Sequence, residues 1–208
     1  CLGFHPWPYL AATPETTDEL RIDLDPSPGV TFDQVREAAQ ETRALFDELG
    51  ITSFVKTSGS KGLHVYVALE PRWDSYDVRR AAVSVARALE ERRPALVTAR
   101  WWKEEREGVF VDFNQNAKDR TVASAWSVRA VRDARVSMPL AWDEVPVCRP
   151  EVFTLPTALV RFVERGDPWA GIDALADADG SLEPLLRLAK QLGPAEKPPK
   201  GEGRRTMT

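Results

Sequence analysis

Three aspartates in the sequence have the residue type and the spacing of a divalent-cation site. Asp23 and Asp25 lie two residues apart in a segment that alternates apolar and charged residues, so on a strand both carboxylates would share one face. Asp112 lies near the end of a second apolar run, at residues 109–113. If these two strands are neighbours, three carboxylates converge, enough to hold two divalent ions for in-line displacement at phosphorus. Taken alone, an Asp-x-Asp pair is more often a strand-end turn or a helix cap.

A glycine-rich loop offers donors for phosphate groups. It occupies residues 57–62, Thr-Ser-Gly-Ser-Lys-Gly, between two β-rich runs. Gly59 and Gly62 would let the backbone approach a ligand, and Ser58, Lys61 and the following His64 could donate to phosphate oxygens. The spacing is not that of a P-loop. The alternative interpretation is a flexible hairpin loop with a structural histidine.

Basic residues gather around and beyond Asp112. Residues 87–135 hold eleven Lys or Arg against eight Asp or Glu, although the whole chain has a net charge of −4. The overall charge argues against a protein that coats nucleic acid nonspecifically, but the local surplus could place a basic surface beside an acidic site. Arginine suits such a surface because its planar fork binds phosphate oxygens in pairs. A solvated strand face explains the same residues, which include Lys118, Arg120, Arg129, Arg132 and Arg135.

Composition limits the class of protein. A chain of 208 residues that is 43% hydrophobic and 29% charged is typical of a soluble globular domain with a sizeable core. No apolar run reaches the ~18 residues of a membrane helix, so a cytoplasmic location is the expectation. Cys1 and Cys148 are the only cysteines, which predicts neither a disulfide framework nor a structural zinc site. The chain opens without Met, and we expect an N-terminal piece to be absent.

The strands that must position these residues can be read from the alternation of apolar and polar side chains. A period of two predicts a half-buried strand at residues 20–24. Residues 51–56 and 63–69 predict a hairpin closed by the glycine-rich loop, and residues 123–128 predict an antiparallel partner for the strand at 109–113. About five strands are therefore expected.

Two long helices are expected between the strands. Thr31 is a good N-cap for the first helix, and Gly50 ends it. Ser75 is expected to cap the second, which Pro94 stops. Two long helices on one face of the sheet make an α+β domain. Shorter helices are expected near residues 157–165 and 182–192, and a disordered tail at 193–208.

Four segments, taken in order, resemble the archaeo-eukaryotic primase superfamily. They are Asp23 to Pro26, residues 57–64, residues 109–112, and Arg129. The likeness is closest to the polymerase domain of bacterial DNA ligase D and its stand-alone primase-polymerase relatives. It spans about residues 1–192 and implies a catalytic core with a mixed or antiparallel, RRM-like sheet flanked by helices, lacking the N-terminal part of the family domain.

The resemblance implies a role for each matching residue. Asp23, Asp25 and Asp112 would be the catalytic metal ligands, holding two divalent ions, Mn²⁺ or Mg²⁺. Gln115 lies where relatives carry Gln or Arg. Arg106 lies near the position of a family arginine that contacts nucleotide or template, although the intervening spacing is shorter by one residue in this sequence. The other residues that would bind the nucleotide are Ser58, Gly59, Lys61, Gly62, His64 and Arg129.

The implied activity is template-dependent nucleotidyl transfer. A DNA repair polymerase or primase would add ribonucleotides, and less readily deoxyribonucleotides, at gaps or broken ends by two-metal catalysis. Expected partners are a DNA primer-template or gapped duplex, ribonucleoside triphosphates, a separate ligase and the end-binding protein Ku, in the bacterial cytoplasm at the nucleoid and away from membranes. Two alternatives stay open: a catalytically idle DNA-binding module that serves recruitment, and a metal-dependent phosphoesterase.

Overall fold

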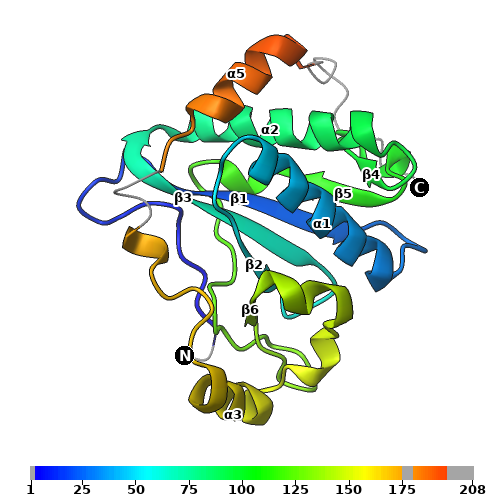
Figure 1. Cartoon of the computed structure of the whole chain (residues 1–208), viewed down its shortest axis with the longest axis vertical. Coiled ribbons are helices and arrows are strands. Elements are labelled where there is room, and N and C mark those ends of the chain that lie inside the picture. Colours follow the sequence, from blue (N-terminus) through cyan, green and yellow to red (C-terminus); the bar gives the residue numbers. More distant parts are fainter. Residues whose placement is uncertain (1–2, 175–179, 196–208) are drawn as a thin grey trace, which may run out of the picture.

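A mixed sheet forms the centre of the molecule. The computed structural model describes residues 3–174 and 180–195. Within them, six strands lie in the order β4-β5-β1-β3-β2-β6 (Figure 1). Their bounds are β1 Thr17–Pro26, β2 Phe54–Thr57, β3 Leu63–Trp73, β4 Val97–Thr98, β5 Val109–Asp112 and β6 Pro139–Leu140. All neighbours are antiparallel except β4 and β5. The expected α+β class with a mainly antiparallel sheet is confirmed.

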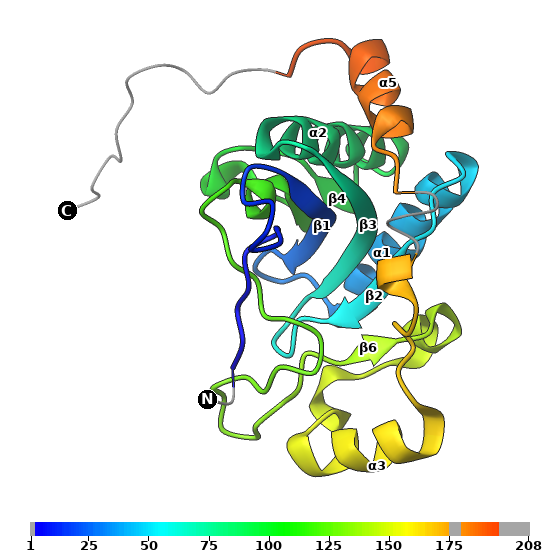
Figure 2. The same cartoon turned by 90° about the vertical axis from the view of Figure 1, so that its left-hand side faces the viewer.

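Helices cover one face of this sheet and leave the other to irregular segments. The helices are α1 Phe32–Glu48, α2 Ser75–Arg92, α3 Leu155–Arg165 and α5 Glu183–Leu192. Helices α1 and α2 pack on the face that carries Leu20, Ile22 and Leu24, each of which has no exposed surface. The N-terminal segment and the chain that follows β5 run over the opposite face (Figure 2). That second face is therefore where a ligand can approach the strands.

The ends of the two long helices follow from local sequence. Thr31 caps α1 in a reciprocal arrangement with Gln34, and Gly50 ends the helix with a φ of +69°. Helix α2 is capped by Asp74, whose carboxylate accepts from two backbone amides of the first turn at 2.9 Å. The prediction that Ser75 caps α2 is thus wrong by one residue, because a carboxylate directly precedes it and binds the same amides.

Residues 123–128 do not form the expected partner strand of β5. Both edges of β5 are already occupied, by β1 and β4, so no third strand can pair there. Trp126 has a φ of +63°, which breaks an extended run. The segment instead pairs locally with residues 136 and 137: the Trp126 amide donates to Ser137 O, and the Ser137 amide donates to Ser127 O, both at 2.8 Å. Arg129 directly follows the strand predicted at 123–128, and because that strand is absent, Arg129 lies on a loop.

A buried asparagine extends the hydrogen bonding of β1 where β5 stops. The Asn116 side chain accepts from the Arg21 amide at 2.9 Å and donates to Arg21 O at 2.7 Å. It thereby satisfies a strand edge that would otherwise be buried without partners. In the part of the chain that the structure describes, no helix is long and apolar enough to cross a membrane. The tail predicted at 193–208 falls, from residue 196 on, outside the described residues.

Candidate active site

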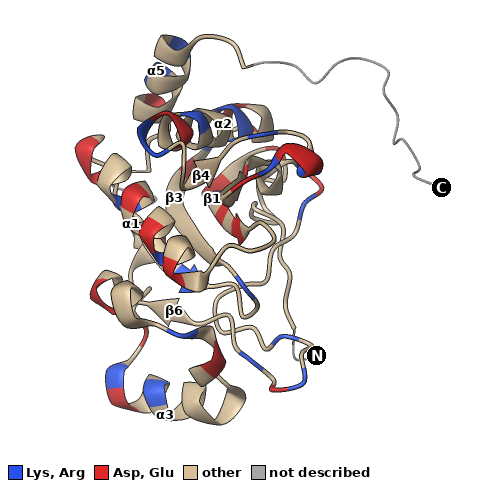
Figure 3. Ribbon diagram, turned by 90° about the vertical axis from the view of Figure 1, so that its right-hand side faces the viewer, with Lys and Arg blue, Asp and Glu red and all other residues tan. Residues whose placement is uncertain are grey.

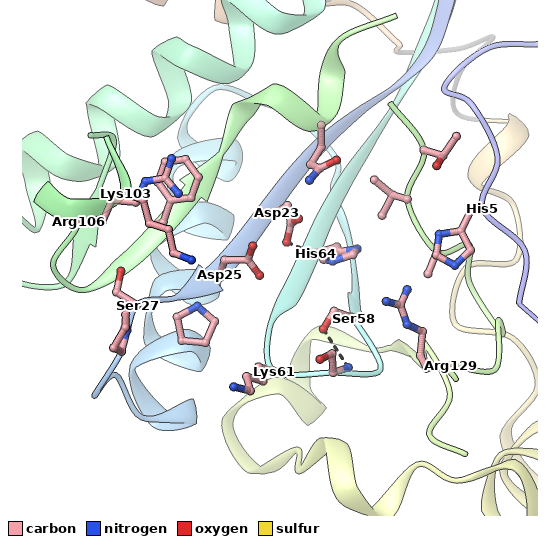
Figure 4. A pocket seen from close by; sticks show the side chains of 18 residues that line it. His5, Asp23, Asp25, Ser27, Ser58, Lys61, His64, Lys103, Arg106 and Arg129 are labelled. Carbon is pink, nitrogen blue, oxygen red and sulfur yellow. Dashed lines mark hydrogen bonds and ion pairs between the residues drawn. The ribbon is translucent and has the colours of Figure 1, made fainter. Parts of the chain in front are cut away.

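Antiparallel pairing brings the three aspartates together on the open face of the sheet. Asp23 of β1 lies opposite Asp112 of β5 in the register. Asp25 follows two residues later on β1, so its side chain points to the same face as that of Asp23 (Figure 4). One carboxylate oxygen of each residue lies within 4.8 Å of those of the other two. The convergence expected from the sequence is present.

The carboxylates are electrostatically unfavourable as three anions. Desolvation raises the pKa of Asp23 to about 6, although Lys56 and Arg129 oppose this shift. Desolvation, joined by the charge of Asp23, also raises the pKa of Asp25 to about 6, even though this side chain has access to solvent. Burial and the Asp23 charge raise the pKa of Asp112 as well. Three acids that disfavour one another's ionised forms would be stabilised by a shared cation.

The donor set fits a hard divalent cation. Asp23 Oδ1 is buried, and among the described residues it has no hydrogen-bond partner. The two oxygens of Asp112 are oriented by neighbours: Oδ1 accepts from the Asn114 amide and Oδ2 from Gln115 Nε2, both at 3.0 Å. Three carboxylates with one unpaired buried oxygen are the ligand type that Mg²⁺ and Mn²⁺ prefer. Gln115 therefore orients a candidate metal ligand.

The glycine-rich loop is closed by its own serine. Ser58 Oγ accepts from the amides of Ser60 and Gly62 at 3.1 and 3.0 Å. Both loop glycines lie where a side chain would not fit: a Cβ would come within 2.4 Å of Arg129 Cγ at Gly59 and of Leu24 O at Gly62. The loop therefore packs tightly against both β1 and the Arg129 loop. It is not the flexible hairpin of the alternative interpretation.

A cleft of about 550 Å³ lies over the aspartates. Most of the residues predicted to bind metal or nucleotide line it, whereas Asp112, Gly59 and Gly62 are not among its lining residues. The lining members of that set are Gln115 and seven residues that Figure 4 labels: Asp23, Asp25, Ser58, Lys61, His64, Arg106 and Arg129. Cationic groups thus surround an acidic floor, which suits a ligand that bears phosphates and is bound together with cations.

The arginines reach the cleft in different ways. Arg106 lies over the Phe110 ring, 3.4 Å from its centroid, and donates to the carbonyls of Arg100 and Trp101. Arg129 comes from the opposite wall, beside the glycine-rich loop (Figure 4). Figure 3 shows that the outer side of α1, by contrast, carries mainly acidic residues. Part of the basic surplus of residues 87–135, namely Arg106 and Arg129, therefore lies at the cleft.

Three cleft-region residues were not predicted from the sequence. His5 and Lys103 line the cleft from the N-terminal segment and from the 3₁₀ turn Lys103–Glu105. Lys56 lies beneath the floor on β2, fully buried, with Nζ 2.9 Å from His64 Nδ1. Only the last had a detectable sign in the sequence, a lysine inside a strand of buried residues, which requires a partner.

Comparison with known proteins assigns first the class of protein and then the family. The polymerase domain of Mycobacterium tuberculosis ligase D, solved in complex with DNA, superposes with a TM-score of 0.71 at 36% sequence identity, covering 80% of this chain and 57% of that one. The shared fold and the convergent aspartates define a nucleotidyltransferase domain. The model of the LigD primase-polymerase domain matches residues 1–169, and the chain belongs to this family.

Curated relatives extend well beyond the matched region. The multifunctional non-homologous end joining protein LigD of Mycolicibacterium smegmatis is 37% identical over 179 residues, which cover 86% of this chain and 23% of that protein. The LigD protein of Pseudomonas aeruginosa is 35% identical over 92% of this chain and 23% of its own length. The bifunctional LigD of Bacillus subtilis is 32% identical over 81% of this chain and 28% of its own. The chain thus spans about a quarter of these relatives.

Proposed function

We propose that this domain adds nucleotides to a primer 3′ end in a template-dependent reaction at gaps or broken ends, with ribonucleotides preferred over deoxyribonucleotides. The observation that carries the proposal is the placement of three convergent carboxylates beneath a cleft rimmed by cationic donors, in a chain of the primase-polymerase family. A gapped duplex, ribonucleoside triphosphates, a ligase and Ku are the proposed partners. Residues 1–192 are proposed as the catalytic core.

The residues of the cleft fall into two groups: carboxylates that would hold the metal ions and cationic side chains that would hold the triphosphate. Asp23, Asp25 and Asp112 would hold two divalent ions, and the chemistry supplied there is activation of the primer hydroxyl and neutralisation of the leaving pyrophosphate. Lys61 and Arg129 line the same cleft as His64 and can together hold a triphosphate there (Figure 4). Positioning of this kind reduces the entropic part of the barrier to in-line attack.

Primer extension on a gapped duplex tests the proposal. The assay compares ribo- and deoxyribonucleotides with Mn²⁺, in the wild type and in Asp112→Asn. We expect ribonucleotide-favouring extension that falls on the order of 100-fold or more in the variant, because a lost metal ligand removes several kcal/mol of transition-state stabilisation. Asp47→Asn, on the exposed surface of α1, is the matched control and should extend normally.

The other outcomes identify the alternatives. DNA binding that needs neither metal nor nucleotide, with no extension by the wild type, would indicate a recruitment module. Shortening of the labelled strand in place of lengthening would indicate a phosphoesterase. Equal extension by the wild type and Asp112→Asn would contradict the assignment of the aspartates.

A further inference from the structure

A buried lysine lies directly behind the histidine of the cleft. The Lys56 side chain has no exposed surface and does not line the cleft. Its Nζ lies 2.9 Å from His64 Nδ1 and 2.7 Å from Ser137 Oγ, and 5.5 Å from the centre of the Tyr66 ring. A group with this placement cannot touch a ligand. It can act only through the residues that it contacts.

Ser137 fixes the direction of the hydrogen bonds around Lys56. The Ser137 hydroxyl donates its proton to Thr57 O at 2.9 Å, so its oxygen can only accept from Lys56. An ammonium has donors and no acceptor, and the contact to His64 Nδ1 must therefore run from the lysine to the ring. A neutral imidazole that accepts at Nδ1 carries its proton on Nε2.

The Nε2 atom of His64 points toward the acidic floor. It lies 3.2 Å from Asp23 Oδ1, yet in the described part of the chain that oxygen has no hydrogen-bond partner. The Nε2–H group is thus a donor next to the cleft that is not committed to an acceptor. The opposite tautomer would present a lone pair to the carboxylate and to any phosphate, which is repulsive.

We propose that Lys56 is a positioning residue, which holds His64 in the Nε2–H tautomer so that the ring presents a donor to a phosphate oxygen of the bound nucleotide. The assignment of the tautomer stands on the hydrogen bonds that Lys56 makes as an ammonium. The use of that donor rests on the proposed function. Lys56 also joins the glycine-rich hairpin to the segment that carries Arg129, because Ser137 lies on that segment.

Nitrogen NMR of the histidine rings tests the tautomer directly. The chain has only two histidines, His5 and His64, so a ¹⁵N-histidine sample gives at most two ring patterns, and His5→Gln assigns them. The spectra are recorded at pH 6, because burial lowers the pKa of Lys56 to about 7 and the group is then an ammonium. We expect wild-type His64 to show a protonated Nε2 and an unprotonated Nδ1. A protonated Nδ1 in the wild type would overturn the proposal, whatever the variants do.

The variants separate positioning from binding. In Lys56→Met, which is similar in length and lacks donors, we expect a mixture of tautomers and a roughly 10-fold rise in KM for the nucleotide. Lys61→Met, on the glycine-rich loop that follows β2, should raise KM but leave the His64 tautomer unchanged. An unchanged Nε2–H tautomer in folded Lys56→Met would contradict the proposal. If no wild-type extension is detected, the proposed function fails, while the ring patterns still decide the tautomer.

Discussion

The two faces of β1 show how one strand serves stability and chemistry at the same time. Leu20, Ile22 and Leu24 point into the helix layer with no exposed surface. The residues between them, Arg21 and Asp23, are almost as deeply buried but point to the cleft side. Because side chains alternate along a strand, one short sequence supplies the residues of both faces. The residues of one face can therefore be substituted without changing those of the other.

The polar face is itself divided. Away from the site, the buried charge of Arg21 is compensated by Glu19, and Arg21 also donates to Pro6 O, although its Nη1 has no hydrogen-bond partner among the described residues. At the site, Asp23 Oδ1 likewise accepts no hydrogen bond from the described residues, and it has two further carboxylates beside it in place of a compensating cation. Buried polar groups are normally satisfied, so an unsatisfied one beside two more carboxylates indicates a place where stability was given up for binding.

The largest expected contrast is between two adjacent residues of β1. Ile22→Ala should lower the free energy of unfolding by about 2–5 kcal/mol, because it opens a cavity under the helices, while extension per folded molecule stays normal. Asp23→Asn should do the reverse: it should not lower the free energy of unfolding, and it should abolish metal-dependent extension. Urea unfolding and primer extension on both variants measure the crossed effects. A loss of stability in Asp23→Asn as large as in Ile22→Ala would break the comparison.

The pH dependence of stability sharpens the same contrast. Without metal, folded Asp23 has a pKa of about 6 against an ordinary 3.8, so the folded state holds the extra proton between these values. Stability contributed by this group is therefore lost as pH rises from about 4 to about 6. In EDTA, Asp23→Asn should match the wild type at pH 4 and exceed it at pH 7 by up to about 3 kcal/mol. Added Mn²⁺ should favour only the wild type.

Urea unfolding at each pH, with and without Mn²⁺, gives this difference directly. Ile22→Ala is the control, since its deficit should be the same at pH 4 and pH 7. A difference between wild type and Asp23→Asn that does not change with pH would mean that the carboxylate is already compensated in the metal-free protein.

Local patterns predicted the central elements well and the long-range ones poorly. The alternation in β1 and the caps of α1 depend on neighbours in sequence, and both were found. The partner of β5 was assigned wrongly because the pairing depends on segments that are distant in sequence. The strand that occupies this edge, β4, is only two residues long. A strand so short carries no period from which to predict it. Strand β2 begins at Phe54, later than predicted, because the Ile51 amide still bonds to Phe46 O of the helix end.

The site residues likewise separate into those that local sequence indicates and those that depend on contacts distant in sequence. The aspartates and the glycine-rich loop are visible in sequence because their residue types are unusual for strands and turns. Lys56 was missed because its partners, His64 and Ser137, are 8 and 81 residues away and only the sheet brings them together. His5 was missed since a segment without regular structure has no pattern that indicates where it crosses the sheet.

The smallest expected effects compare two glycines, one at each side of the sheet. At Gly50 a Cβ meets nothing within 4 Å, but φ is +69°, so Gly50→Ala should cost about 1 kcal/mol and leave KM unchanged. At Gly62 a Cβ would meet Leu24 O at 2.4 Å and Asp25 Oδ1 at 3.4 Å, so the hairpin must move away from β1. Gly62→Ala should therefore raise KM for the nucleotide several-fold, and it should cost more stability than Gly50→Ala because backbone has to move. Equal KM values for the two variants would show that the fit between the hairpin and β1 is not needed for nucleotide binding.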